Sequence, residues 1–136
     1  SGARRLSTDG RGVDGTDIVG IKTGSVEDAI VVFPDPMCAT GGSVVQGVEA
    51  YLEKAQGTPL KVIVMPLIIT PEAARELTKK MPEVTVYALR LDRGMSSAEA
   101  LRRVPGSDPE ESGLTEEDYI VPGGGGFGER LTNSEA

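Results

Sequence analysis

Residues 31–43, VVFPDPMCATGGS, decide the fold of this chain because they join three kinds of structure in one short run. An apolar run ends in a single acid, Asp35, and is followed by small and hydroxyl residues and then by a helical pattern. This order predicts a strand, a turn and a helix N-terminus, whose free N–H groups and partial positive charge attract an anion. Asp35 is expected at the carboxyl end of the strand, where open parallel sheets bind ligands.

The turn has the residue types that suit a phosphate. Gly41 and Gly42 allow close approach of the backbone, and Thr40 and Ser43 add hydroxyl donors. The turn has neither the Gly-Lys-Ser/Thr of a P-loop nor the G-x-G-x-x-G of a dinucleotide site. An acid beside such a turn suits the hydroxyls of a phosphorylated sugar. The alternative is a glycine-rich turn without a ligand, in which Asp35 only caps backbone N–H groups.

The rest of the pattern predicts an α/β fold with a parallel sheet. Apolar strands are expected at 29–33, 62–69 and 84–89, and a helix at 43–56. A second helix begins after Thr70, a good N-cap followed by proline. The order β-α-β-α-β implies a parallel sheet with right-handed crossovers.

This topology leaves one face of the sheet without helices to cover it. With the three strands in sequential order, both crossovers lie on one face of the sheet, and the other face is bare. Residues 62–69 are apolar without alternation, which is typical of a strand covered on both faces. We expect a fragment, a processed subunit or half of a split enzyme, covered by another polypeptide, either a second copy or a chain that supplies a missing N-terminal half.

Five segments are expected along the chain. Residues 1–28 read as a flexible arm or loop, 29–95 as the α/β core, 96–118 as a charged insertion, 119–130 as a glycine-rich terminal element and 131–136 as a tail. Within the insertion, Ser96 or Ser97 is expected to cap a short helix that runs through Arg103, and residues 105–117 show no core pattern. A short strand is expected at 119–121.

Composition excludes several classes of function. The 136 residues carry a net charge of −7, which argues against nucleic acid as a partner. There is no histidine and one cysteine, Cys38, so a Ser-His-Asp mechanism, a zinc site and an intrachain disulfide are excluded. Without a histidine base, Cys38 reads as a small loop residue and not as a nucleophile. No apolar run approaches the ~20 residues of a membrane span, and we expect a cytoplasmic protein.

Two motifs resemble those of uracil phosphoribosyltransferases. Residues 35–43, DPMCATGGS, are similar to the phosphoribosyl-diphosphate motif of that family. Residues 119–130, YIVPGGGGFGER, are similar to its uracil-binding hood, typically Tyr-Ile-Ile/Val-Pro-Gly-x-Gly-Asp-x-Gly-Asp-Arg. The resemblance covers roughly residues 30–130 and corresponds to the second half of such an enzyme.

The resemblance implies a phosphoribosyltransferase-like core with a small C-terminal hood, incomplete by itself. It implies a reaction of phosphoribosyl diphosphate with uracil that gives UMP and diphosphate, with transient Mg²⁺ bound together with the diphosphate and no metal held by the protein alone. Asp35 would be the catalytic carboxylate beside the ribose. The implied phosphoribosyl-diphosphate site is Asp35, Pro36, Met37, Cys38, Ala39, Thr40, Gly41, Gly42 and Ser43, and the implied uracil site is Ile120, Gly125, Gly126 and Phe127.

Three departures from the family keep other functions open. Gly126 stands where the family has Asp, the segment between Met95 and Tyr119 is longer and more charged, and the first half of the family is absent. The alternatives are a non-catalytic relative that binds a nucleotide or phosphoribosyl diphosphate in a regulatory or scaffolding role, and a transferase for another base.

Overall fold

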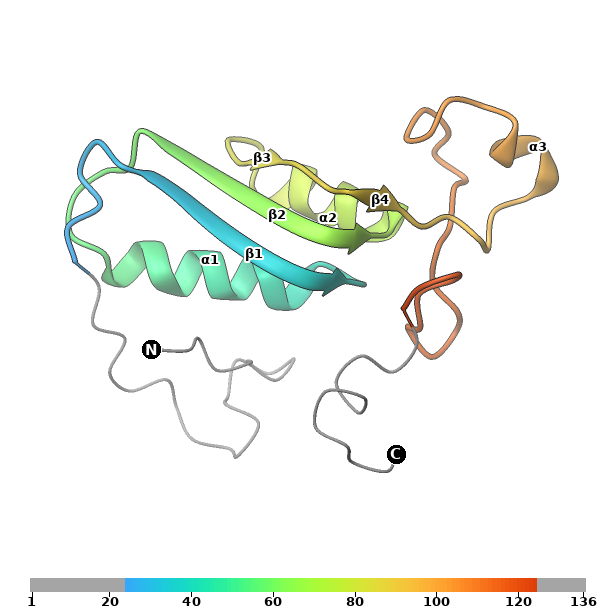
Figure 1. Cartoon of the computed structure of the whole chain (residues 1–136), viewed down its shortest axis with the longest axis horizontal. Helices are drawn as coiled ribbons and strands as arrows, with labels where there is room; N and C mark the ends of the chain where they lie inside the picture. The colour runs from blue at the N-terminus through green and yellow to red at the C-terminus, as the bar shows by residue number, and fades with distance from the viewer. Residues whose placement is uncertain (1–23, 125–136) are drawn as a thin grey trace.

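The structure, a computed structural model, describes residues 24–124, which form an α/β fold around one parallel sheet (Figure 1). The sheet has the strand order β1-β2-β3, and β4 also pairs with β2, all in parallel. The β-α-β-α-β order expected from the sequence is therefore confirmed. The elements are β1 (Ile30–Cys38), α1 (Gly42–Lys54), β2 (Lys61–Ile69), α2 (Pro71–Lys80), β3 (Thr85–Val86), β4 (Arg90–Leu91) and α3 (Ala98–Leu101).

Strand β1 is longer than expected from the sequence. It continues past Phe33 to Cys38 and pairs with β2 from Ile30↔Lys61 to Cys38↔Ile69. The added part contains Pro34 and Pro36, and among the described residues β1 lies at the edge of the sheet. An edge strand tolerates proline because half of its backbone N–H groups need no partner in the ladder.

The third expected strand, 84–89, is divided in two. β3 pairs with β2 at Ile63↔Thr85, β4 pairs with it at Ile68↔Arg90, and the ladder is broken between them. Pro66 of β2 lies opposite the break. Because proline has no N–H, β2 cannot donate a ladder hydrogen bond at this position, which accounts for the gap.

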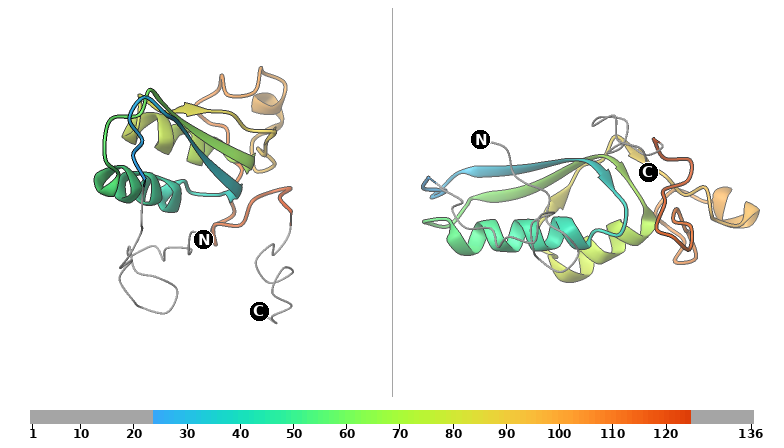
Figure 2. Two further views of the ribbon diagram at one scale, coloured as in Figure 1. Left: turned by 60° about the vertical axis from the view of Figure 1, so that its left-hand side comes forward. Right: turned by 90° about the horizontal axis from the view of Figure 1, so that it is seen from below.

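The helices begin where their caps predict. Helix α2 follows Thr70, whose hydroxyl accepts a hydrogen bond from the N–H of Ala73 at 3.0 Å. Helix α1 starts at Gly42, within one residue of the expected start. Both helices lie on the same face of the sheet, as the right-hand view of Figure 2 shows. The expectation that both crossovers lie on one face is therefore confirmed.

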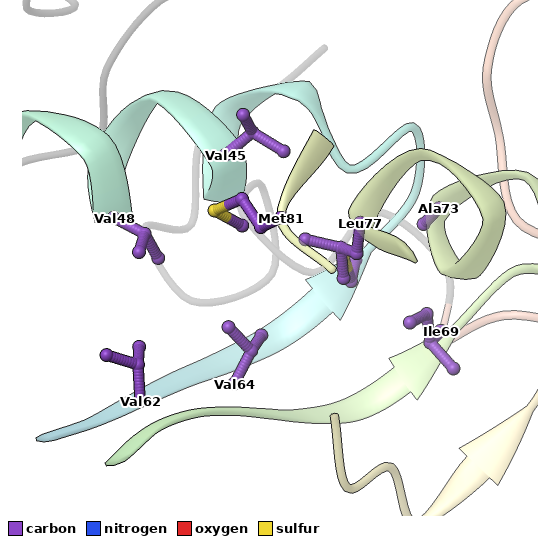
Figure 3. Close-up of a cluster of buried hydrophobic side chains, with 9 residues drawn as sticks. Val45, Val48, Val62, Val64, Ile69, Ala73, Leu77 and Met81 are labelled. Atoms are coloured by element: carbon purple, nitrogen blue, oxygen red, sulfur yellow. The ribbon is translucent and has the colours of Figure 1, made fainter. Parts of the chain in front are cut away.

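The hydrophobic core fills the space between the sheet and the two helices. Phe33 and Tyr51 close one end of it with an edge-to-face ring contact, their centroids 5.3 Å apart. Because the chain has only two Phe, three Tyr and no Trp, the core is built mainly of aliphatic side chains and depends on close packing. Figure 3 labels its buried members Val45, Val48, Val62, Val64, Ile69, Ala73, Leu77 and Met81, and Cys38 belongs to the same cluster.

The opposite face of the sheet exposes apolar side chains. Within residues 24–124 no helix covers this surface, which we call the open face. The apolar run of β2 therefore alternates in burial, with Val62, Val64 and Pro66 buried and the residues between them directed to the open face. The open face carries Ile30, Val32, Met65 and Leu67, which are 60%, 45%, 46% and 50% exposed.

The segments outside the sheet also differ from expectation. Residues 119–121 form no strand and have only an isolated bridge between Leu114 and Ile120. Helix α3 ends at Leu101 and is capped by Ser97, whose hydroxyl accepts from the N–H of Ala100. In the expected N-terminal arm, Val26 is buried beside a bridge from Ser25 to Gln56. In the described part of the chain, no helix has the length and apolar character to cross a membrane.

Candidate functional site

The first motif, residues 35–43, which we call the phosphate loop, spans the end of β1, a short turn and the first residues of α1. Gly41 is the N-cap of α1, with a φ of 83°, and no side chain caps the helix. A Cβ on Gly41 would lie 3.2 Å from both Cα and the carbonyl oxygen of Ala73 in α2. Glycine is thus required here by a left-handed backbone and by close packing. The uncapped helix end leaves first-turn N–H groups directed at the site expected for an anion.

Gly42 has a different environment. A Cβ on Gly42 would meet only the hydroxyl oxygen of Thr40, at 3.8 Å. The protein therefore leaves space at this residue, and its φ is not of the left-handed type. The open space at Gly42 fits a backbone that a ligand approaches closely. The hydroxyl of Thr40 accepts a weak hydrogen bond from the N–H of Gly42 at 3.5 Å, and Ser43 is exposed in the first turn.

Thr70 holds the phosphate loop from the next strand end. Its hydroxyl donates to the carbonyl of Ala39 at 2.5 Å, and its N–H donates to the carbonyl of Cys38 at 3.3 Å. The side chain of Thr70 is fully buried. One threonine therefore caps α2 and fixes the phosphate loop at the carboxyl ends of β1 and β2, which was not expected from the sequence.

Asp35 lies within β1 and not beyond its end. It is half-buried, and its Oδ1 accepts a hydrogen bond from the N–H of Met37 at 3.0 Å. This contact is the backbone-capping role weighed from the sequence, and it also fixes the direction of the carboxylate. Pro36 and Met37 complete the strand, both half-buried.

Cys38 is not a nucleophile in this fold. Its side chain is 1% exposed in the core. Burial, with a smaller contribution from the negative charge of Asp35, raises the pKa of the Cys38 thiol to about 12. The thiol therefore stays protonated near neutral pH, as the absence of a histidine base already indicated.

The second motif comprises residues 119–130, and we call its first part, residues 119–127, the base loop. The structure describes residues 119–124 of this loop. Gly125, Gly126 and Phe127, three of the four expected uracil-site residues, lie outside the described residues. Ile120 is half-buried and bridges to Leu114. The described part lies near the carboxyl ends of β1 and β2 (Figures 1 and 2).

The two motifs meet at Met37 and Gly124, which lie 87 positions apart in the sequence. A Cβ built on Gly124 would lie 3.6 Å from Sδ of Met37 and 3.9 Å from Cδ1 of Ile68. Met37 belongs to the phosphate loop, and it pairs with Ile68 across β1 and β2. The structure therefore brings the start of the base loop into contact with the phosphate loop.

A buried carboxylate that sequence reasoning missed anchors the base loop. Asp92, 2% exposed, accepts from Arg90 at 2.5 and 2.8 Å and from the N–H of Gly123 at 2.7 Å. Arg90 also donates to the carbonyl of Gly123 at 3.0 Å. The pair thus binds both backbone groups of one loop residue. The signal available in the sequence was an acid directly after a strand, at the sheet edge where ligands bind.

The charged insertion also contains buried carboxylates that its sequence did not indicate. Glu111, 1% exposed, accepts from Arg93 at 2.6 Å and from the N–H of Gly106 at 2.8 Å. Asp108, 7% exposed, accepts from Arg103 at 2.9 Å. Buried carboxylates need such partners because unpaired charges are costly to bury. Residues 105–117, which show no core pattern in the sequence, therefore bury two paired carboxylates.

A metal ion at the phosphate loop would need ligands beyond the protein side chains in the described part of the chain. Among residues 24–124, no group of three or more acidic, thiol or imidazole side chains could hold one. Asp35 is the carboxylate of the phosphate loop. This fits Mg²⁺, which commonly binds through one or two carboxylates together with substrate phosphates and retained waters.

Comparisons with known proteins agree with this geometry. A family model described as uracil phosphoribosyltransferase matches residues 22–107, which include the phosphate loop. A uracil phosphoribosyltransferase of Thermococcus sibiricus is 31% identical over 104 residues, which cover 76% of this chain and 35% of that protein. The solved structure of AQ2163 protein from Aquifex aeolicus matches with a TM-score of 0.58 and 30% identity, over 79% of this chain and 41% of that one. This chain therefore spans less than half the length of these relatives.

Proposed function

Because the chain belongs to the uracil phosphoribosyltransferase family, we propose that it carries the phosphate loop and base loop of an enzyme for pyrimidine salvage. The reaction transfers phosphoribosyl from phosphoribosyl diphosphate to uracil and releases UMP and diphosphate. The observation that carries the proposal is the approach of Gly124 to Met37. A sugar phosphate bound at one loop would thereby meet a base bound at the other.

This reaction requires positioned substrates and electrostatic stabilisation of the transition state, and it requires no nucleophilic side chain. Breaking the bond at the anomeric carbon builds positive charge on the ribose, which a nearby carboxylate stabilises. Asp35 is assigned this role, with its carboxylate oriented by the N–H of Met37. The N-terminus of α1 and the hydroxyls of Thr40 and Ser43 would hold the 5′-phosphate. Mg²⁺ bound to the diphosphate would neutralise charge on the leaving group.

Diphosphate release from phosphoribosyl diphosphate, measured with and without uracil, tests the proposal. We expect release that depends on uracil and is lost in Asp35→Asn. The control is Asp28→Asn, an exposed residue before the start of β1, at the other end of the strand from the phosphate loop. Release without dependence on any base, or unchanged release in Asp35→Asn, would contradict the assignment.

A specific departure keeps a second function in consideration. Gly126, outside the described residues, replaces the Asp of the family motif, while the phosphate loop matches the family throughout. This difference favours retained binding of phosphoribosyl diphosphate or a nucleotide with reduced or altered use of uracil. Nucleotide binding without diphosphate release for any base identifies a non-catalytic regulatory or scaffolding relative. Release with a base other than uracil identifies a different transferase.

The open face leads us to propose a protein partner. Its side chains from β1 and β2 are 45–60% exposed, and a strand apolar on both sides is typical of a sheet covered on both sides. The relatives contain more polypeptide than this chain, which is the kind of segment that could cover it. Either a second copy or a chain equivalent to that additional part would occupy the face.

Sedimentation tests this partner proposal. We expect a dimer, or a complex with a chain equivalent to the additional part of the relatives. Leu67→Lys should dissociate it, whereas Lys79→Glu, exposed on α2 and away from the open face, should leave it assembled. A wild-type monomer of high thermal stability would contradict the proposal.

A further inference from the structure

The first turn of α2 is connected to the charged insertion by a carboxylate that the proposed reaction does not use. Glu72 accepts a hydrogen bond from the hydroxyl of Ser112 at 2.6 Å and from the N–H of Gly113 at 3.1 Å to each of its oxygens. One turn further along α2, Arg75 donates to the carbonyl of Glu111 at 3.1 Å. Residues 111–113 are therefore fixed to the helix that also packs against Gly41 of the phosphate loop.

The same residues hold the base loop. The carbonyl of Gly113 accepts from the N–H of Val121 at 2.9 Å, and the N–H of Gly94 donates to the carbonyl of Val121 at 2.8 Å. Val121 is thus hydrogen-bonded on both sides of its backbone. No side chain fits at either neighbour, since a Cβ on Gly94 would lie 2.7 Å from the oxygen of Val121, and one on Gly113 would overlap the oxygen of Asp92.

Two residues further on, the buried Asp92 and its partner Arg90 bind the N–H and the carbonyl of Gly123. The described base loop is therefore held at two points by two carboxylates from different elements. Asp92 binds it directly, and Glu72 acts through the insertion.

We propose that Glu72 is a positioning residue for the base: it fixes residues 112–113 of the insertion, and these fix the backbone of the base loop at Val121. The inference rests on the proposed function and adds to it a role for the segment in which this chain departs from the family. The insertion thereby connects α2, which packs against the phosphate loop, to the base loop. Glu72 contacts neither phosphate nor base.

The first test uses amide hydrogen exchange and requires no activity. In Glu72→Gln, which keeps the size and one acceptor oxygen but loses the charge, the amides of Val121 and Gly113 should exchange roughly tenfold faster, as expected for weakening a hydrogen bond to a charged group. The amide of Val64 in the central strand should not change. The control Glu117→Gln, an exposed glutamate of the same segment, should change none of them.

A kinetic test separates positioning from general stability. Glu72→Gln should raise KM for uracil by roughly tenfold and leave the affinity for phosphoribosyl diphosphate unchanged. Ser112→Ala should have the same effect in smaller degree, and the double variant should be no worse than Glu72→Gln alone, because both changes break one connection.

The outcomes distinguish the two proposals. If exchange at Val121 does not change in Glu72→Gln, the positioning role is wrong, whatever the activity. If amide exchange at Val121 becomes faster in Glu72→Gln but the wild-type protein releases no diphosphate with any base, the positioning role of Glu72 stands and the proposed reaction is wrong. Equal losses in uracil and phosphoribosyl-diphosphate affinity would also overturn the positioning role, because they indicate a general loss of structure.

Discussion

The phosphate loop and the base loop lie side by side but are held in different ways. The phosphate loop is a short connection between β1 and α1, fixed by its own backbone, by Thr70 and by the packing of Gly41 on α2. The base loop is held by side chains and backbone from three separate places, at Arg90 with Asp92, Gly94 and Gly113, and Gly113 is in turn hydrogen-bonded to Glu72.

This difference bears on what can vary in the family. A loop fixed by local backbone geometry depends on a few residue types, and the phosphate loop matches the family motif throughout. A loop fixed by distant side chains can change its own sequence as long as the outer contacts persist. The base loop has Gly126 where the motif that it resembles has Asp.

The largest expected effect is at the phosphate loop. Gly42→Val fills the space that the ligand is proposed to occupy, so binding of phosphoribosyl diphosphate or UMP should fall at least roughly a hundredfold in calorimetry, about 2.7 kcal/mol. Gly47→Val is the matched control, because it places the same side chain in the same helix with nothing within 4 Å of its Cβ. Unchanged affinity in folded Gly42→Val would remove this loop from the site.

A gain of function in the base loop is the next largest effect. Gly126→Asp restores the carboxylate of the family motif and should raise uracil turnover roughly tenfold to a hundredfold, as expected for a charged hydrogen bond worth ~1.5–3 kcal/mol in the transition state. Turnover is measured by diphosphate release. A proficient wild-type enzyme that the substitution leaves unchanged or slows would show that the departure at Gly126 is harmless.

Thr70→Val tests whether one side chain holds the phosphate loop. The substitution keeps the shape but removes the cap of α2 and the hydrogen bond to Ala39, and it should lower the free energy of unfolding by about 1–3 kcal/mol. Urea denaturation measures the loss. Thr78→Val, at an exposed helix position whose hydroxyl bonds only to the carbonyl of Ala74, should cost much less. Equal losses would contradict the anchoring role.

The smallest effect expected is a dependence on pH in the base loop alone. Burial opposes ionisation of Glu72, but hydrogen bonds from Ser112 and Gly113 and the charge of Arg75 outweigh it and lower its pKa below the ordinary 4.5. The stabilisation that Glu72 provides is therefore fully present above pH 4.5 and is lost as pH falls through the lowered pKa. An NMR titration of the Glu72 carboxyl carbon should show a midpoint below 4.5. A midpoint above it would mean that the hydrogen bonds do not stabilise the charged form.

The parts of the structure that could be predicted from the sequence are those with local causes. The cap at Thr70, the helix start near Gly42 and the placement of both crossovers on one face follow from residue type, spacing and handedness. The continuation of β1 through Pro34 and Pro36 could not be predicted locally, because it depends on the edge position of that strand. The break opposite Pro66 depends on register in the same way.

Long-range polar contacts account for most of what was missed at the site. Asp108 and Glu111 lie in an acidic stretch that reads as solvated, and only their pairing with Arg103 and Arg93 makes burial favourable. Asp92 and Glu72 depend on loop residues that lie 31 and 41 positions away. A single sequence gives residue types but not these pairings.

The position of Cys38 makes its thiol a natural probe of local opening at the phosphate loop. It is the sole sulfhydryl of the chain, and it is the last residue of β1, within the phosphate loop. In the structure its side chain is buried, and its raised pKa keeps it protonated near neutral pH. A disulfide reagent can therefore react with it only during local opening, and the labelling rate counts those openings. A ligand that stabilises the phosphate loop should lower this labelling rate, which can be measured without an introduced dye or an engineered residue.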